Sequence, residues 1–110
     1  MVSANLTTVR KQYAYFQKLF ADDVIFLQVG RFFEFYHNSS KKIAELLGLA
    51  HLKVNQRDAR FGFPVNFMQK YLQKTLRHSK SVMVILEGEY VARIKERKIW
   101  RRYECESGRI

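Results

Sequence analysis

A large aromatic residue and a carboxylate two residues apart, Phe32 and Glu34, are the residues of this sequence best suited to recognition chemistry. They lie in an aromatic segment with the composition of a strand, where alternate side chains share a face. Phe32 and Glu34 are therefore expected to project together, and Phe33 and Phe35 to point the opposite way, into a core. A flat apolar ring beside a hydrogen-bond acceptor suits insertion into a base stack and recognition of a base edge. The alternative is a half-buried strand with an exposed glutamate.

The composition predicts an anionic partner. The chain has 20 Lys and Arg against 10 Asp and Glu, a net charge of +10, and this excess favours phosphate or an anionic membrane surface. Nucleic acid is favoured over a membrane, and a cytoplasmic location is expected, because no apolar run approaches the roughly 18 residues of a span and no secretory signal begins the sequence. With one cysteine and three scattered histidines, the sequence has no metal-ligand spacing, so no metal or cofactor is expected.

The periodicity of apolar residues predicts one α/β domain over residues 1–110, with a mixed sheet of about five to six strands flanked by about three helices. In chain order we expect a helix over 8–21, strands over 24–29 and 32–36, a helix from 38–40 to a C-cap at Gly48, a weak strand over 49–54, a loop over 55–60, an extended segment over 61–65, a helix after a capping box of Asn66 and Gln69, a strand over 81–86, a turn over 87–89 and a strand over 91–103.

Ten basic residues are the candidate contacts to a nucleic-acid backbone. Those in the segment 91–103 surround Ile99 and Trp100, and basic residues interleaved with an aromatic suit a surface that follows phosphates. An edge strand kept charged to avoid aggregation is the alternative. The ten candidates are Arg31, Lys53, Lys70, Lys74, Arg93, Lys95, Arg97, Lys98, Arg101 and Arg102.

The order of elements and four short motifs resemble the N-terminal mismatch-recognition domain of the MutS mismatch repair proteins. This resemblance covers residues 9–103 and implies that Phe32 enters the minor groove and stacks on a mispaired base, while Glu34 forms a hydrogen bond with that base. The motifs are Gln12-Tyr13, Gly30-Arg31-Phe32-Phe33-Glu34, Gly62-Phe63-Pro64 and Tyr71-Leu72.

Two positions depart from the family pattern. Arg31 stands where the family typically has an acidic residue, and it would add a phosphate contact. Asn66 stands where a histidine is usual. The sequence contains no Gly-x-x-x-x-Gly-Lys-Ser/Thr motif, so ATPase activity is not expected.

The resemblance leaves two origins open. One is a fragment of a larger MutS protein. The other is a free-standing protein similar to those found beside reverse transcriptases of diversity-generating retroelements, which would bind DNA, RNA or a hybrid of the two, or the polymerase itself.

A catalytic function has little support in the sequence. Metal-dependent nuclease chemistry needs clustered carboxylates. Glu34, Glu87 and Glu89 are the candidates, but the last two flank a glycine in an expected turn, and no Cys or His nucleophile arrangement occurs. Docking to a protein is the other alternative. We therefore expect a binding module, not an enzyme, that detects mispaired or distorted double-stranded DNA with Phe32 and Glu34.

Overall fold

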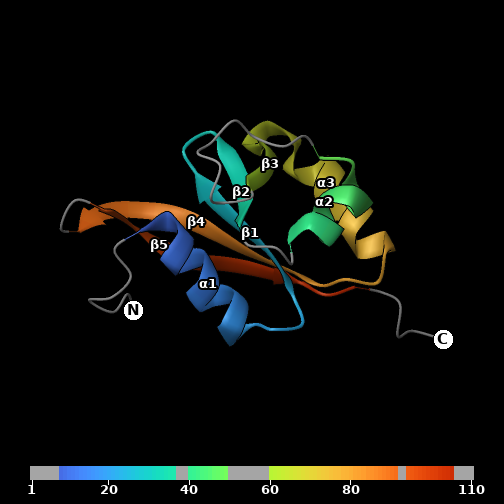
Figure 1. The fold of residues 1–110 in the computed structure, drawn as a ribbon, viewed down its shortest axis with the longest axis horizontal. Helices are drawn as coiled ribbons and strands as arrows, with labels where there is room; N and C mark the ends of the chain where they lie inside the picture. Colours follow the sequence, from blue (N-terminus) through green and yellow to red (C-terminus); the bar gives the residue numbers. More distant parts are fainter. Residues whose placement is uncertain (1–7, 37–39, 50–59, 92–93, 106–110) are drawn as a thin grey trace.

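The computed structural model describes residues 8–36, 40–49, 60–91 and 94–105, and within these ranges five strands form one sheet in the order β3-β2-β1-β4-β5. Figure 1 shows the helices packed around this sheet. The elements are α1 (Val9–Leu19), β1 (Val24–Val29), β2 (Phe32–Tyr36), α2 (Ser40–Leu47), β3 (Arg60–Pro64), the 3-10 helix η1 (Val65–Phe67), α3 (Met68–Arg77), β4 (Val82–Val91) and β5 (Ile94–Tyr103).

The sheet is mixed, which confirms the predicted α/β class. Strand β1 runs parallel to β4, while the other neighbouring pairs are antiparallel. Strand β1 lies in the centre of the sheet, and Ile25, Phe26 and Leu27 are fully buried. A continuous apolar run is what a strand covered on both faces requires.

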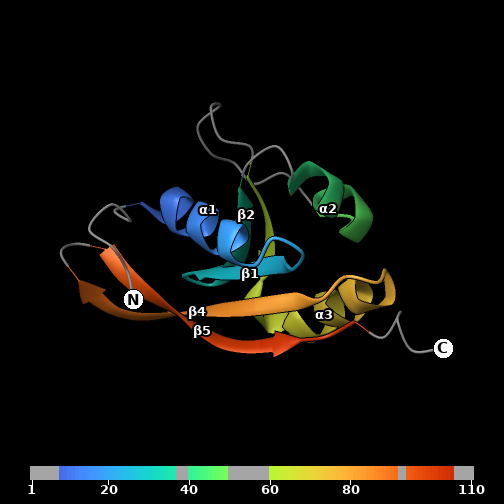
Figure 2. The same ribbon diagram turned by 90° about the horizontal axis from the view of Figure 1, so that it is seen from below.

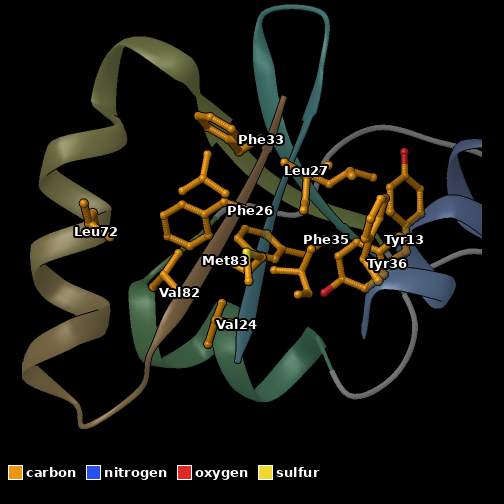
Figure 3. Close-up of a cluster of buried hydrophobic side chains, with 14 of the residues drawn as sticks. Tyr13, Val24, Phe26, Leu27, Phe33, Phe35, Tyr36, Leu72, Val82 and Met83 are labelled. Atoms are coloured by element: carbon orange, nitrogen blue, oxygen red, sulfur yellow. The ribbon is translucent and has the colours of Figure 1, made fainter. Parts of the chain in front are cut away.

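The two faces of the sheet are covered by different helices. Phe26 on β1 contacts Phe63 on β3, with ring centroids 5.2 Å apart, and Phe63 stacks on Tyr71 of α3 at 4.4 Å. On the opposite face, Tyr36 of β2 lies against Tyr13 of α1, at 5.7 Å. Figure 3 shows this arrangement, with α3 on one side of the buried cluster and α1 on the other. Helix α2 packs against β3 and α3.

Local sequence signals set one end of each of two helices. The side chain of Thr8 accepts a hydrogen bond from the backbone N–H of Lys11 and caps α1. Gly48 has a φ of +68° after α2, and the N–H of Leu49 donates to the carbonyl of Ala44 at 2.9 Å. This is the left-handed C-cap expected at Gly48.

Two local predictions were wrong. Residues 87–89 do not form a turn, because β4 continues through them to Val91, with a shift of register between Glu87 and Tyr90. A bulge accommodates Gly88 without ending the strand. The capping box of Asn66 and Gln69 does not form, since η1 precedes α3 and the N-cap of α3 is Phe67, which makes no side-chain cap.

Two further expectations fall mostly outside the described residues. The weak strand over 49–54 is described only at Leu49, which lies outside any strand, and the loop over 55–60 only at Arg60, which begins β3. Within the described ranges, no helix combines the length and the apolar character that crossing a lipid bilayer demands.

Candidate nucleic-acid interface

The turn between β1 and β2 presents the aromatic motif. Val29 pairs with Phe32, so only Gly30 and Arg31 connect the two antiparallel strands. Gly30 has a φ of +61°, whereas Arg31 does not have a positive φ. This is the pattern of a type II′ turn, which favours glycine at its first central position. The exposed Arg31 at the second position places a cation directly before the aromatic ring.

Phe32 is half-buried at the first position of β2, at the turn end of the strand. The following residues alternate as the sequence predicts: Phe33 and Phe35 are 2% and 1% exposed on the α3 side of the sheet. Phe32 therefore shares the other face with Glu34 and Tyr36. Of these three residues, Phe32 is the most accessible to a ligand.

Glu34 lies deeper than its predicted role requires. It is 5% exposed, and the hydroxyl of Tyr36 donates a hydrogen bond to Glu34 Oε1. Tyr36 in turn packs against Tyr13 of α1. The neighbouring phenol thus provides a partner for the carboxylate, whose contact with an external base would require the side chain to turn out toward Phe32.

A network of polar side chains, buried at Gln12 and Arg97, links the turn to the rest of the sheet. Its centre is Arg97 of β5, which is 4% exposed. Arg97 Nε donates to the carbonyl of Gln28, Nη1 donates to Gln12 Oε1, and both bonds are 3.0 Å long. Arg97 Nη2 forms an ion pair with Glu87 Oε2 at 3.1 Å. This arginine therefore joins β5 to β1, α1 and β4.

Glu87 connects this network to the turn. Its Oε2 also accepts a hydrogen bond of 2.7 Å from the N–H of Gly30. Gln28 adds two bonds, accepting from the N–H of Glu87 at 3.0 Å and donating to the carbonyl of Gly30 at 3.1 Å. The N–H and the carbonyl of Gly30 are thus both bonded to side chains. These bonds tie the turn that carries Arg31 and Phe32 to β1 and β4.

The structure argues against one of the predicted phosphate contacts, Arg97. This residue is 4% exposed and its guanidinium makes four hydrogen bonds to internal acceptors, so a nucleic acid on the surface does not reach it. Arg102 remains on the surface, but its Nε and Nη2 bind the two carboxylate oxygens of Asp23 at 2.8 and 3.0 Å. These hydrogen bonds and the charge of Asp23 raise the pKa of Arg102 above its ordinary value.

The other predicted cations fall into separate groups. Lys70 is exposed in the first turn of α3, whereas Lys74 Nζ donates to the carbonyl of Leu47 at the end of α2. On β5, the side chains of Lys95 and Arg97 approach the β1–β2 turn, because both pair with Glu87, whose Oε2 accepts from the N–H of Gly30. Among the other cations, Lys98 pairs with Glu96 and Arg101 is exposed, while Lys53 and Arg93 lie outside the described residues.

Phe67 and the polar network were not predicted from the sequence. Phe67 is 53% exposed at the end of η1, and this segment adjoins the turn because the N–H of Val65 donates to the carbonyl of Arg31 at 2.8 Å. The signal for Phe67 in the sequence was an aromatic residue shortly after the Gly62-Phe63-Pro64 motif. The network had no local signal, because Gln12 and Arg97 are 85 residues apart in the chain.

A hollow of about 360 Å³ lies between α1 and α2, and Asp22, Asp23 and Lys80 are among its lining residues. Its two carboxylates do not suit a phosphate backbone. The accessible features that fit an anionic duplex are instead Arg31, Phe32 and the start of α3.

Comparisons with known proteins identify a related family. The family model of MutS domain I matches residues 7–104. The chain is 28% identical over 80 residues to the DNA mismatch repair protein MutS of Borreliella burgdorferi (strain ZS7) and to that of Borreliella afzelii (strain PKo). The alignment covers 73% of this chain and 9% of each relative, so the chain spans a small part of the length of these curated relatives. The matches confirm the resemblance inferred from the motifs.

Proposed function

This chain belongs to the MutS domain I family, and we propose that it is a binding module that recognises mispaired or distorted double-stranded DNA by inserting Phe32 into the minor groove. The observation that carries this proposal is the placement of Phe32 beside a turn that Glu87 and Gln28 hold by both polar groups of Gly30. An inserted side chain must be held firmly if its insertion is to unstack the bases and not displace its own turn.

Selectivity in this proposal comes from the DNA. Inserting a ring between base pairs requires partial unstacking, which costs a few kcal/mol per step. A mispair is already weakly paired and stacked, so the same ring meets a smaller cost there. Arg31 and the exposed Lys70 would hold the backbone on either side of the ring without reading the sequence.

Glu34 has the second role in the proposal. Its carboxylate, now bonded to Tyr36, would turn toward the groove and accept a hydrogen bond from the displaced base. Near phosphates the carboxylate also repels ordinary duplex DNA, and only a base donor offsets this repulsion. Glu34 would thereby weaken binding to matched DNA and preserve the preference for a mispair.

The other candidate functions can be separated by the ligand that binds. An accessory protein of a reverse transcriptase would bind a DNA–RNA hybrid or the polymerase in preference to a DNA duplex. A module that only docks on a protein would bind no nucleic acid when purified alone. A nuclease would need carboxylates that are free to bind a metal ion. Glu87 is instead engaged by Arg97, Lys95 and Gly30. Within the described residues, no group of three His, Cys, Asp or Glu side chains is placed to bind a metal.

The salt dependence of binding tests the contacts with phosphates. If Arg31 and Lys70 each neutralise one phosphate, the logarithm of the affinity for duplex DNA should fall with the logarithm of salt concentration with a slope of about −2 or steeper. Arg31→Gln and Lys70→Gln should each make the slope shallower by about 0.9. Lys18→Gln, at the exposed far end of α1, is the matched control for net charge and should leave the slope unchanged. An unchanged slope in Arg31→Gln would remove that residue from the interface.

Glu34→Gln tests base recognition with little change of shape. The amide retains an oxygen that can accept from Tyr36 but removes the charge. We expect Glu34→Gln to bind matched duplex at least as tightly as the wild-type chain does. The preference for a mismatch should fall several-fold, because a hydrogen bond to a charged group contributes about 1.5 to 3 kcal/mol and one to a neutral group about 0.5 to 1.5 kcal/mol. Competition binding at one salt concentration measures both quantities. Tyr36→Phe, which leaves the carboxylate in place, is the control and should retain the preference. An unaltered preference in Glu34→Gln would end the proposed role of this residue.

A further inference from the structure

The outer strand β5 carries an aromatic and cationic surface that the proposed mismatch site does not use. Trp100 is 46% exposed, and the guanidinium carbon of Arg101 lies 4.9 Å from the centre of its ring. The same guanidinium lies 5.9 Å from the ring of Tyr103, and the two rings are 6.4 Å apart. We call these three residues the β5 platform.

The charge of Arg101 is available to a ligand. Its planar group rests on two rings, which restrains the side chain while its N–H edges remain unoccupied by any carboxylate of the described chain. The neighbouring arginines differ, since Arg97 is paired with Glu87 and Arg102 with Asp23. A guanidinium restrained in this way is prepared for an incoming phosphate. Lys98, with 68% of its side chain exposed, adds a second cation on the same strand.

The partner must supply both an anion and a flat apolar face. A phosphate fits Arg101, and a base fits the exposed ring of Trp100, because every base has a face on which an aromatic side chain can stack. In a duplex the faces of the bases are already covered by their neighbours, so only unpaired nucleotides offer them. We propose that the β5 platform binds single-stranded nucleic acid through base stacking on Trp100 and phosphate contact with Arg101.

This site is distinct from the one around Phe32. Arg101 and Tyr103 pair with Val84 and Val82 of β4, which pair in turn with Phe26 and Val24 in the first half of β1, whereas the β1–β2 turn follows Val29 at the other end of that strand. Figure 2 shows β5 on the outside of the sheet, next to β4, and in the strand order it is the last strand at the end opposite β3.

The chain offers an internal reporter for this test, because Trp100 is its only tryptophan. Titration of the wild-type chain with a short oligothymidylate should quench the tryptophan fluorescence as a thymine stacks on the indole. A matched duplex at the same nucleotide concentration should quench much less. Polyglutamate, an anionic polymer without bases, should leave the fluorescence unchanged. Absence of quenching by the oligonucleotide, or equal quenching by the duplex or by polyglutamate, would overturn the proposal.

Variants separate the two sites. Using a labelled oligothymidylate, we expect Trp100→Leu to weaken single-strand binding about tenfold or more, and Trp100→Phe, which keeps a ring, to weaken it less. Arg101→Lys should also weaken it, because the charge remains but the planar group is lost. Phe32→Ala should bind the single strand as the wild type does, and Trp100→Leu should keep any preference for a mismatched duplex. Unchanged single-strand affinity in a folded Trp100→Leu would refute the platform even if the mismatch site is real.

Discussion

Replacing Phe33 with alanine is expected to lower the free energy of unfolding by about 3 to 5 kcal/mol. Phe33 is 2% exposed, and its ring lies 5.8 Å from that of Phe26 and 5.6 Å from that of Phe63. Truncation of Phe33 would leave a cavity that the neighbouring rings cannot fill, because the backbone of the sheet fixes their positions. Each kcal/mol lowers the melting temperature of a domain of this size by about 4 to 8 °C, so thermal unfolding measures the loss directly.

Phe32→Ala is the matched control, since it removes the same ring from the adjacent position of β2. Phe32 is half-buried, so its loss should destabilise the chain less than the loss of Phe33. A larger drop in melting temperature for Phe32→Ala than for Phe33→Ala would contradict the assignment of the two faces. The wedge proposed for Phe32 would fail with it.

Arg97→Ala should destabilise the chain by about 3 to 5 kcal/mol, an effect as large as that of a core aromatic. The reason is not the strength of the ion pair itself. Removing Arg97 takes a donor from the side-chain oxygen of Gln12 and from the carbonyls of Gln28 and Lys95. Glu87 also loses its buried partner and keeps only Lys95 and the N–H of Gly30. Chemical denaturation of the variant and the wild type measures the difference.

Two controls accompany this variant. Arg97→Lys preserves the charge but cannot form the four bonds that the guanidinium makes, so an intermediate loss is expected. Lys98→Ala, at the exposed neighbouring position, should change stability by less than about 0.5 kcal/mol. Equal stability of Arg97→Ala and Lys98→Ala would show that the buried network does not hold the sheet together.

Much of the fold was predictable because its signals are local. The alternation of side chains along β2 placed Phe33 and Phe35 in the core, and both are fully buried. The left-handed conformation of Gly48 followed from its place after an apolar stripe. The apolar run of 24–29 is typical of a strand covered on both faces, and β1 is such a strand in the centre of the sheet. Each of these inferences depends on residues a few positions apart.

The remaining features depend on partners far away in the chain. The sequence 87–89 resembles a turn, but the N–H of Glu87 is bonded to Gln28 and its carboxylate to Gly30, at separations of 59 and 57 residues. These contacts keep the segment in the strand. In the sequence, Arg97 is likewise indistinguishable from the surface cations of its basic segment, because no neighbouring residue indicates that Gln12 and Glu87 are its partners.

The burial of Glu34 was missed for a related reason. The period of the strand gives the face on which the side chain lies, and it placed Glu34 on the same face as Phe32. Coverage of that face by α1, through Tyr13 and Tyr36, is a tertiary property. The motif therefore indicated where the candidate site lies. The exposure of Phe32 and Glu34 depends on how α1 packs on the sheet, which the motif does not reveal.

The most direct test of the proposed function compares wild-type and Phe32→Ala chains for binding to two duplexes that differ only in one mispair. We predict that the wild type prefers the mismatched duplex, and that Phe32→Ala loses about 1 to 3 kcal/mol at the mismatch while its weaker binding to the matched duplex persists. Equal preference for the mismatch in the two proteins, with Phe32→Ala still folded, would contradict the wedge.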